Sequence, residues 1–196
     1  MKSEQKICLE CGFCCDGTLF LHASLNKGER GNLPYKIEQQ FFSEGDKDYF
    51  RLPCLYFSGN CSIYKNKRAD ICSSFRCQLL IDYSGKNISL NEAINIISQA
   101  RALRDKIFAE FSHLSGINRV ICFKNLIKEL IKHIESGTID EKQTVIKLYE
   151  MLLGKCNVLE ALLVKHMRSK GEFIDLMADR NDQVILSEQS YLDELK

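Results

Sequence analysis

Hydrophobic residues recur at helical spacing through the C-terminal half of the chain. Between Ser89 and Gly116 they follow one another at steps of three and four, which places them on one face of a helix. Ser89 is a typical N-cap, and Glu92 three residues later completes a capping box. Gly116 marks the expected end. These positions predict a long amphipathic helix whose apolar face packs into a core.

The same spacing predicts three further helices. They are expected over residues 117–134, 145–153 and 158–167. Gly137 is expected to end the first of them, because glycine is common just after the last helical residue. Gly154 is expected to separate the other two. The C-terminal half is therefore predicted to contain about four helices.

The N-terminal half has shorter hydrophobic runs and more turn residues. Residues 18–22 and 48–57 are predicted strands, and the second of them alternates between apolar and polar side chains. Gly59-Asn60 is a predicted hairpin turn. Such a turn is expected to place Cys54 and Cys61 on neighbouring strands.

A run of turn residues at 83–87 separates these two patterns. Just before it, residues 68–80 predict a short helix or turn. We therefore expect a cysteine-cluster metal-binding domain over residues 1–86 and a helical domain over residues 87–196. The predicted fold class is α+β and mostly α, with short strands confined to the small N-terminal half.

Cysteine is concentrated in that N-terminal half. Of the ten cysteines, eight precede residue 80, and four of these eight lie within residues 8–15. The other two, Cys122 and Cys156, have apolar neighbours and are expected to be buried as small hydrophobic residues. The eight candidate metal ligands are Cys8, Cys11, Cys14, Cys15, Cys54, Cys61, Cys72 and Cys77.

The spacing of the first cysteines is typical of chelation. A Cys-x-x-Cys turn lets two sulfurs point at one centre, and Gly12 can adopt a positive φ that tightens this turn. Cys8, Cys11 and Cys14 also match the first three positions of the bacterial ferredoxin run. Thr18 stands at the fourth position of that run, so the match is partial.

Cys14 and Cys15 are adjacent, which restricts what they can share. Their Cα atoms lie about 3.8 Å apart across a trans peptide, whereas a disulfide prefers a separation of about 5.5 Å. We expect the two thiols to serve different metals, or one to bind metal while the other stays free. His22 is a further candidate ligand, although a single histidine is more often structural.

A disulfide framework is the alternative use of eight cysteines, and it needs an oxidising compartment. The N-terminal residues contain no apolar signal-peptide core. We therefore expect a cytoplasmic protein with reduced thiols that bind metal.

Composition and motifs exclude several other classes. A formal net charge of +1 creates no general field for nucleic acid or for an anionic membrane, and we expect neither partner. The chain contains no dinucleotide-binding glycine motif, P-loop, nucleophile elbow or zincin motif. The expected partners are a metal ion or cluster and a protein substrate or partner.

The order of these residues resembles the CxxCxxCC family of YkgJ-type zinc- or iron-chelating proteins, which includes flagellin lysine N-methylases. The resemblance covers about residues 8–80. The chain departs from the family where Ala69 follows Arg68 in place of the usual proline. The resemblance implies a metal or iron–sulfur centre. It rests on the run CxxCxxCC and then on Pro53-Cys54, Gly59-x-Cys61-x-Ile63-Tyr64, Arg68, Cys72 and Phe75-x-Cys77.

Two functions remain open from these residues. The first is an iron or iron–sulfur protein, with a 4Fe–4S cluster as one form, that carries electrons or catalyses a reaction. It is favoured by the partial ferredoxin run and the number of thiols. The second is a structural zinc module joined to a helical protein-interaction domain. Eight thiolates would fill two tetrahedral zinc sites, and Cys11-Gly12 suits a zinc knuckle.

An enzymatic role would need a reactive group beside the metal. Cys15 is the candidate catalytic residue, as a thiolate whose pKa is lowered by the metal and by Arg68 or Arg76. The resemblance to flagellin N-methylases implies S-adenosylmethionine as a methyl donor. Aromatic rings can hold its sulfonium, although such rings more often only pack around a site. The candidate cofactor-binding residues are Tyr56, Tyr64, Phe75 and Arg68.

Overall fold

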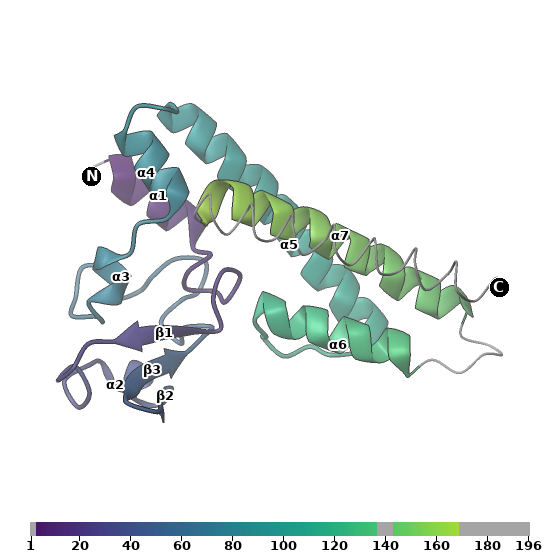
Figure 1. The fold of residues 1–196 in the computed structure, drawn as a ribbon, viewed down its shortest axis with the longest axis horizontal. Coiled ribbons are helices and arrows are strands. Elements are labelled where there is room, and N and C mark those ends of the chain that lie inside the picture. The colour runs from purple at the N-terminus through teal and green to yellow at the C-terminus, as the bar shows by residue number, and fades with distance from the viewer. Residues whose placement is uncertain (1–2, 137–142, 169–196) are drawn as a thin grey trace, which may run out of the picture.

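The computed structural model describes residues 3–136 and 143–168 and contains seven helices and one three-stranded sheet in these ranges (Figure 1). This confirms the predicted α+β, mostly α class. The strands are β1 (His22–Leu25), β2 (Phe41–Glu44) and β3 (Lys47–Arg51). The helices are α1 (Ser3–Cys11), α2 (Tyr35–Glu38), α3 (Ile71–Ser74), α4 (Gln78–Ser84), α5 (Leu90–Ser115), α6 (Phe123–Glu135) and α7 (Gln143–Met167).

The three strands form an antiparallel sheet in the order β1-β3-β2. The predicted strand at 18–22 is wrong in position, because β1 begins only at His22. The predicted strand at 48–57 ends at Arg51, two residues before Pro53, whose nitrogen cannot donate to a ladder. Beyond it, Phe57 and Cys61 form a single β-bridge around the expected turn instead of two strands.

The capping signals of the long helix are confirmed. The Ser89 hydroxyl accepts a hydrogen bond from the Glu92 backbone N–H at 3.2 Å, and the Glu92 carboxylate accepts one from the Ser89 N–H at 2.7 Å. Gly116 ends α5 in the left-handed conformation with φ of 70°. The boundaries of α5 are therefore set by its own local sequence.

Helix α6 starts later than its hydrophobic spacing predicts. It begins at Phe123 and not at residue 117. The Phe123 N–H donates to the Gly17 carbonyl oxygen at 3.0 Å, so the start of α6 is held against an N-terminal loop. The expected end at Gly137 lies outside the described residues.

The predicted break at Gly154 is wrong, because α7 runs through this residue without interruption. A glycine inside a helix costs only about 1 kcal/mol relative to alanine. Leu152, Cys156, Leu159 and Leu163 are buried at helical spacing on both sides of it. Their packing continues the stripe across Gly154 and outweighs that cost.

The main hydrophobic core lies among the long helices and extends into the cysteine-rich half. Figure 1 shows α5 and α7 running side by side, with α1 and α4 near one end of them. Ile7 of α1 and Leu79 of α4 belong to this core, as do Ile97 and Phe111 of α5. A second, smaller core lies at the sheet. None of the helices in the described parts of the chain is long and apolar enough to cross a membrane.

Alanine substitutions at Gly154 and Gly116 should change stability in opposite directions. Gly154 is exposed, and nothing lies within 4 Å of an added Cβ, so Gly154→Ala should raise the free energy of unfolding by about 0.5–1 kcal/mol. Gly116→Ala should lower it by about 1 kcal/mol, because alanine resists the positive φ. Urea titration measures both, and a loss of stability in Gly154→Ala would contradict a continuous α7.

Candidate metal centre

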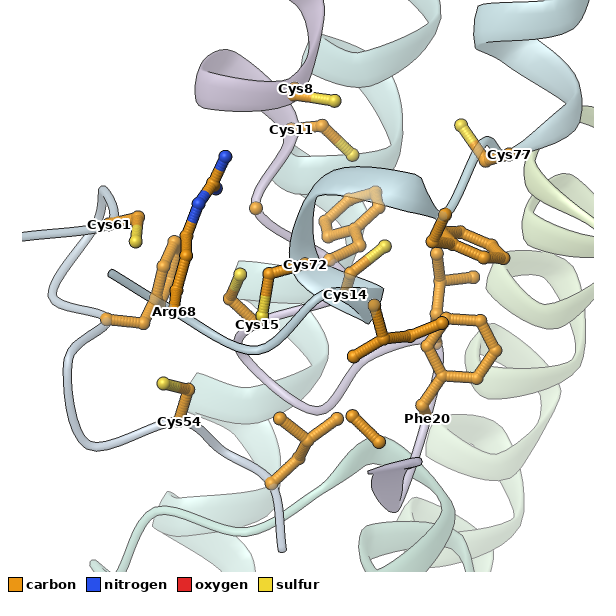
Figure 2. A pocket seen from close by; sticks show the side chains of 18 of the residues that line it. Cys8, Cys11, Cys14, Cys15, Phe20, Cys54, Cys61, Arg68, Cys72 and Cys77 are labelled. Carbon is orange, nitrogen blue, oxygen red and sulfur yellow. The ribbon is translucent and has the colours of Figure 1, made fainter. Parts of the chain in front are cut away.

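All eight N-terminal cysteines line one cavity of about 280 Å³ (Figure 2). The cavity lies between α1, the β1 strand, the loop after β3, α3 and the start of α4. Most of its other lining residues are apolar, such as Leu19, Ile37 and Phe50. The fold thus gathers around one cavity the cysteines that lie up to 69 positions apart, from Cys8 to Cys77.

The first four cysteines are positioned by α1 and the turn that ends it. Cys8 and Cys11 lie on α1, and the Gly12 N–H donates to the Cys8 carbonyl oxygen at 3.1 Å. Gly12 has φ of 70°, which confirms the positive φ expected there. The Cys15 N–H then donates to the Gly12 carbonyl oxygen at 2.8 Å, so this turn presents Cys14 and Cys15 to the cavity.

The other four cysteines reach the cavity from separate segments. The Cys54 N–H donates to the Cys15 carbonyl oxygen at 2.8 Å, which joins the loop after β3 directly to the first cluster. Cys61 lies at the Phe57–Cys61 bridge, Cys72 lies on α3, and Cys77 directly precedes α4.

Electrostatic interactions divide the eight thiols into two groups. The pKa of Cys11 is raised to about 12, mainly by burial and also by the charges of Cys77, Asp16 and Cys8. Burial also raises the pKa of Cys14, with contributions from Cys11, Cys77, its neighbour Cys15, and Cys8. We call Cys8, Cys11, Cys14 and Cys77 the first set.

The remaining thiols interact with one another in the same way. Burial raises the pKa of Cys15, followed by the charges of Cys54, Cys72 and Cys61. The pKa of Cys72 is raised to about 11, mainly by desolvation of its thiol and also by the charges of Cys54 and Cys61, although the residue as a whole is exposed. We call Cys15, Cys54, Cys61 and Cys72 the second set. The adjacent residues Cys14 and Cys15 therefore belong to different sets.

The sulfurs surround the cavity without converging on a point. Within residues 3–136 and 143–168, no group of three or more His, Cys, Asp or Glu side chains is placed to hold a metal ion as it stands. His22, the other candidate ligand, lines the cavity, and its ring lies 4.7 Å from that of Tyr49 and 5.6 Å from that of Phe42. These aromatic contacts agree with a structural role for His22.

The aromatic side chains expected at a cofactor site already contact other residues. The Arg68 guanidinium lies 4.3 Å above the Tyr64 ring. Phe75 packs edge-on against Phe20 at 5.2 Å. Both Tyr64 and Phe75 line the cavity. Tyr56 is not among its lining residues, and the Lys36 ammonium lies 5.3 Å from its ring.

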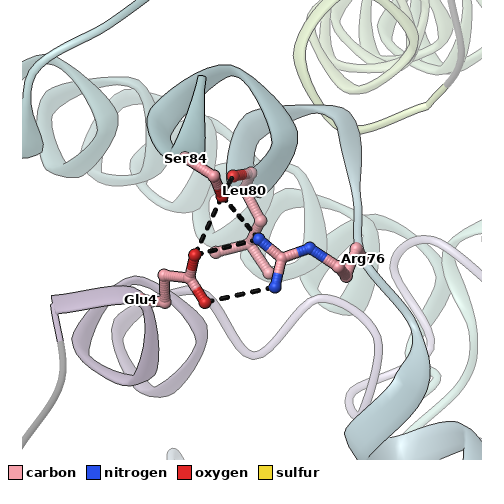
Figure 3. A network of polar contacts seen from close by, with 4 residues as sticks. All are labelled: Glu4, Arg76, Leu80 and Ser84. Carbon is pink, nitrogen blue, oxygen red and sulfur yellow. Dashed lines mark hydrogen bonds and ion pairs between the residues drawn. The ribbon is translucent and has the colours of Figure 1, made fainter. Parts of the chain in front are cut away.

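Arg76, expected near Cys15, takes part in a different network (Figure 3). Its guanidinium forms two hydrogen bonds to the Glu4 carboxylate, at 2.9 and 3.1 Å. It also donates to the Ser84 hydroxyl at 2.5 Å, and this hydroxyl lies 2.5 Å from the Leu80 carbonyl oxygen. The network joins α1 to α4 and so holds Cys77 beside the cysteines of α1.

A buried ion pair that the sequence analysis missed holds the turn of Cys14 and Cys15. Asp16 pairs with Arg104 of α5, and both side chains are largely buried. Burial raises the pKa of the Asp16 carboxyl despite the charge of Arg104 beside it. The sequence does contain a sign of this pair. Arg104 lies four residues after Ala100 and three before Ile107, so a charged residue interrupts the apolar face of α5 and needs a buried partner.

Cys122 and Cys156 are fully buried in apolar surroundings, as predicted. The Cys122 thiol donates to the Leu52 carbonyl oxygen at 3.0 Å. Neither residue lines the cavity of the eight thiols.

The chain matches no family model, no curated protein and no solved structure. The resemblance to the CxxCxxCC family therefore stays a prediction that rests on the order of its cysteines.

Gly12→Ala should destabilise the protein more than the same substitution at a positive-φ glycine with free space around it. An added Cβ would lie 2.5 Å from Cζ of the Phe57 ring, in addition to the strain of φ at +70°. Gly28→Ala is the matched control, because φ is +88° there and nothing lies within 4 Å. We expect Gly28→Ala to lower the free energy of unfolding by about 1 kcal/mol and Gly12→Ala by about 1–3 kcal/mol more. Equal losses in urea titration would show that Phe57 does not restrict this position.

Proposed function

We propose that this chain binds metal through its eight N-terminal cysteines, as two centres of four thiolates each. The first set would hold one centre and the second set the other. The observation that supports this division is the grouping of the thiols around the cavity, with Cys14 in one set and Cys15 in the other. Four thiolates are the usual ligand number both for iron–sulfur clusters and for structural zinc.

The spacing of the first set favours an iron–sulfur cluster. In two-cluster ferredoxins, the first three cysteines of the run bind one cluster and the fourth ligand comes from elsewhere in the chain. Cys8, Cys11 and Cys14 reproduce that run, and the charge of the distant Cys77 acts on Cys11 and Cys14, which supports Cys77 as the fourth ligand. Thr18, which is buried, stands at the fourth position of the run. In ferredoxins the cysteine at that position binds the other cluster, so Thr18 does not argue against a cluster on the first set.

The second set contains no Cys-x-x-Cys pair. Its members Cys15, Cys54, Cys61 and Cys72 come from separate segments. Structural zinc sites are typically built on pairs with short spacing. The second set therefore matches neither the zinc-knuckle pattern nor the ferredoxin run, and the preference for iron–sulfur chemistry rests on the first set.

Each set includes one exposed cysteine, which supports an electron-carrying role. Cys8 is exposed in the first set and Cys72 in the second, while the other members are partly covered. Through these residues a cluster would approach the surface, where it could exchange electrons with a protein partner. Solvent exposure of this kind is also one of the properties that set a cluster's reduction potential.

Methyl transfer is not included in this proposal. The Tyr64 ring is in contact with Arg68, and Phe75 is in contact with Phe20. These contacts support the simpler interpretation, in which the aromatic residues pack around the centre. A role for Cys15 in methyl transfer from S-adenosylmethionine stays a prediction from the family resemblance.

Metal analysis of protein purified without oxygen tests the proposal. We expect iron and acid-labile sulfide in the wild-type protein, whereas a colourless protein with zinc would support the structural alternative. Cys77→Ser and Cys72→Ser should each remove about half of the metal, because a hydroxyl replaces a thiolate poorly. Cys156→Ala is the matched control, since Cys156 is buried away from the cavity, and it should keep full metal content. Absence of bound metal from the wild-type protein would contradict the proposal.

Removal of the metal should unfold one part of the chain more than the other. Most residues of the main core belong to α5, α6 and α7, whereas the core at the sheet is small and lies beside the cysteines. Small thiolate domains commonly depend on metal for their fold. A chelator should therefore abolish protection from hydrogen exchange in β1, β2 and β3 while α5 and α7 stay protected. Simultaneous loss of protection in α5 would show that the long helices also depend on the metal.

A further inference from the structure

The wall of the cysteine cavity contains one permanent charge. Among the lining residues in the described part of the chain, Arg68 is the only Asp, Glu, Lys or Arg. The other polar lining groups are thiols, hydroxyls and the His22 ring, and the rest of the wall is mostly apolar. Arg68 is half-buried there, so solvent screens its charge only in part and the charge can act on nearby thiolates.

Arg68 lies near cysteines of both sets. In the view of Figure 2 its side chain passes between Cys61 and Cys15 of the second set, and its guanidinium end extends to the level of Cys8 and Cys11 of the first set. Its guanidinium is held in place by the Tyr64 ring at 4.3 Å. Stacking of this kind fixes a planar guanidinium while leaving its N–H groups at the edge free to face anions.

The electrostatics of the thiols agree with this position. The charge of Arg68 acts on Cys8 of the first set and on Cys72 of the second. Arg76, by contrast, acts on Cys8 and Cys77, which both belong to the first set.

Two adjacent four-thiolate centres would repel each other. A divalent ion bound by four thiolates keeps a net charge of about −2, and clusters ligated by four thiolates are anionic as well. Because Cys14 and Cys15 are joined by one peptide bond, these two negative centres must lie close together. In a cavity with apolar walls their repulsion is weakly screened. A cation between them lowers this repulsion.

We propose that Arg68 is the shared counter-charge of the two centres and that it stabilises metal on both sets at once. This inference rests on the proposed function, because it requires that both sets bind metal. Arg68 is a positioning residue in this account, since it acts through the charge of the thiolates and is not itself a ligand.

The test uses two single-site parents, so that each set is measured alone. Cys77→Ser leaves the second set intact, and Cys72→Ser leaves the first set intact. Anaerobically purified protein is challenged with EDTA, and the metal that stays bound is measured over time. Adding Arg68→Gln should increase the rate of metal loss about tenfold in both parents, which is the usual scale for losing a supporting group near a metal.

Two further variants separate charge from structure. Lys67→Gln removes the same charge from the neighbouring exposed position, outside the cavity, and should leave metal loss unchanged. Arg68→Lys keeps the charge without the planar guanidinium, and it should lose metal more slowly than Arg68→Gln. Equal effects of Arg68→Lys and Arg68→Gln would overturn the role as a counter-charge.

The remaining outcomes are also decisive. An effect of Arg68→Gln in only one of the two parents would overturn the shared role while leaving the two centres in place. The same would follow if Arg68→Gln behaved like Lys67→Gln. If neither parent retained metal although the wild-type protein did, the two sets would not bind independently, and a shared role for Arg68 between separate centres would be wrong. Wild-type protein without metal would reject the proposed function itself, and this inference with it.

Discussion

The peptide bond between Cys14 and Cys15 is the constraint on which the candidate centre depends. It holds two Cα atoms about 3.8 Å apart, and the two thiols interact with different partners. Cys14 interacts with the cysteines of α1 and with Cys77, and Cys15 interacts with three cysteines from later segments. One turn of the chain thus belongs to both sets. Any change in the position of this turn would move a ligand of each set together.

Several separate contacts bring distant segments to that turn. The Cys54 N–H bonds to the Cys15 carbonyl oxygen, which positions the loop after β3. The Phe57 ring lies close against Gly12, where only a glycine leaves it room. The exposed pair of Glu4 and Arg76 joins α1 to the segment of Cys77. Exposed ion pairs contribute little to stability on their own, so we regard this last contact as a means of alignment.

Helix α5 contacts the chain on both sides of the Cys14-Cys15 turn. Arg104 of α5 pairs with Asp16, and Arg101 of the same helix donates to the Glu10 carbonyl oxygen at 2.6 Å. Buried ion pairs often contribute little net stability, because desolvation offsets their attraction, but they fix relative position.

The Cys122 thiol, just before α6, donates a hydrogen bond to the Leu52 carbonyl oxygen near the sheet. The main core also contains residues from both sides of residue 86, so the two halves pack as neighbours. The predicted division into domains at that residue stays a prediction.

The sequence by itself determined the features that depend on local chemistry. The capping box of Ser89 and the left-handed Gly116 set the ends of α5, because both act within a few residues. The positive φ of Gly12 could be predicted for the same reason. The adjacency of Cys14 and Cys15 also predicts that they do not share one metal, and this stays a prediction.

Tertiary structure decided the features that depend on distant partners. Packing on both sides of Gly154 kept α7 continuous, although glycine alone favours a break. The assignment of Cys77 to the first set and of Cys72 to the second could not be predicted, since only four residues lie between them and either could have reached either set. Only the packing of α3 and α4 around the cavity separates them, because burial and long-range contacts are properties of the folded chain.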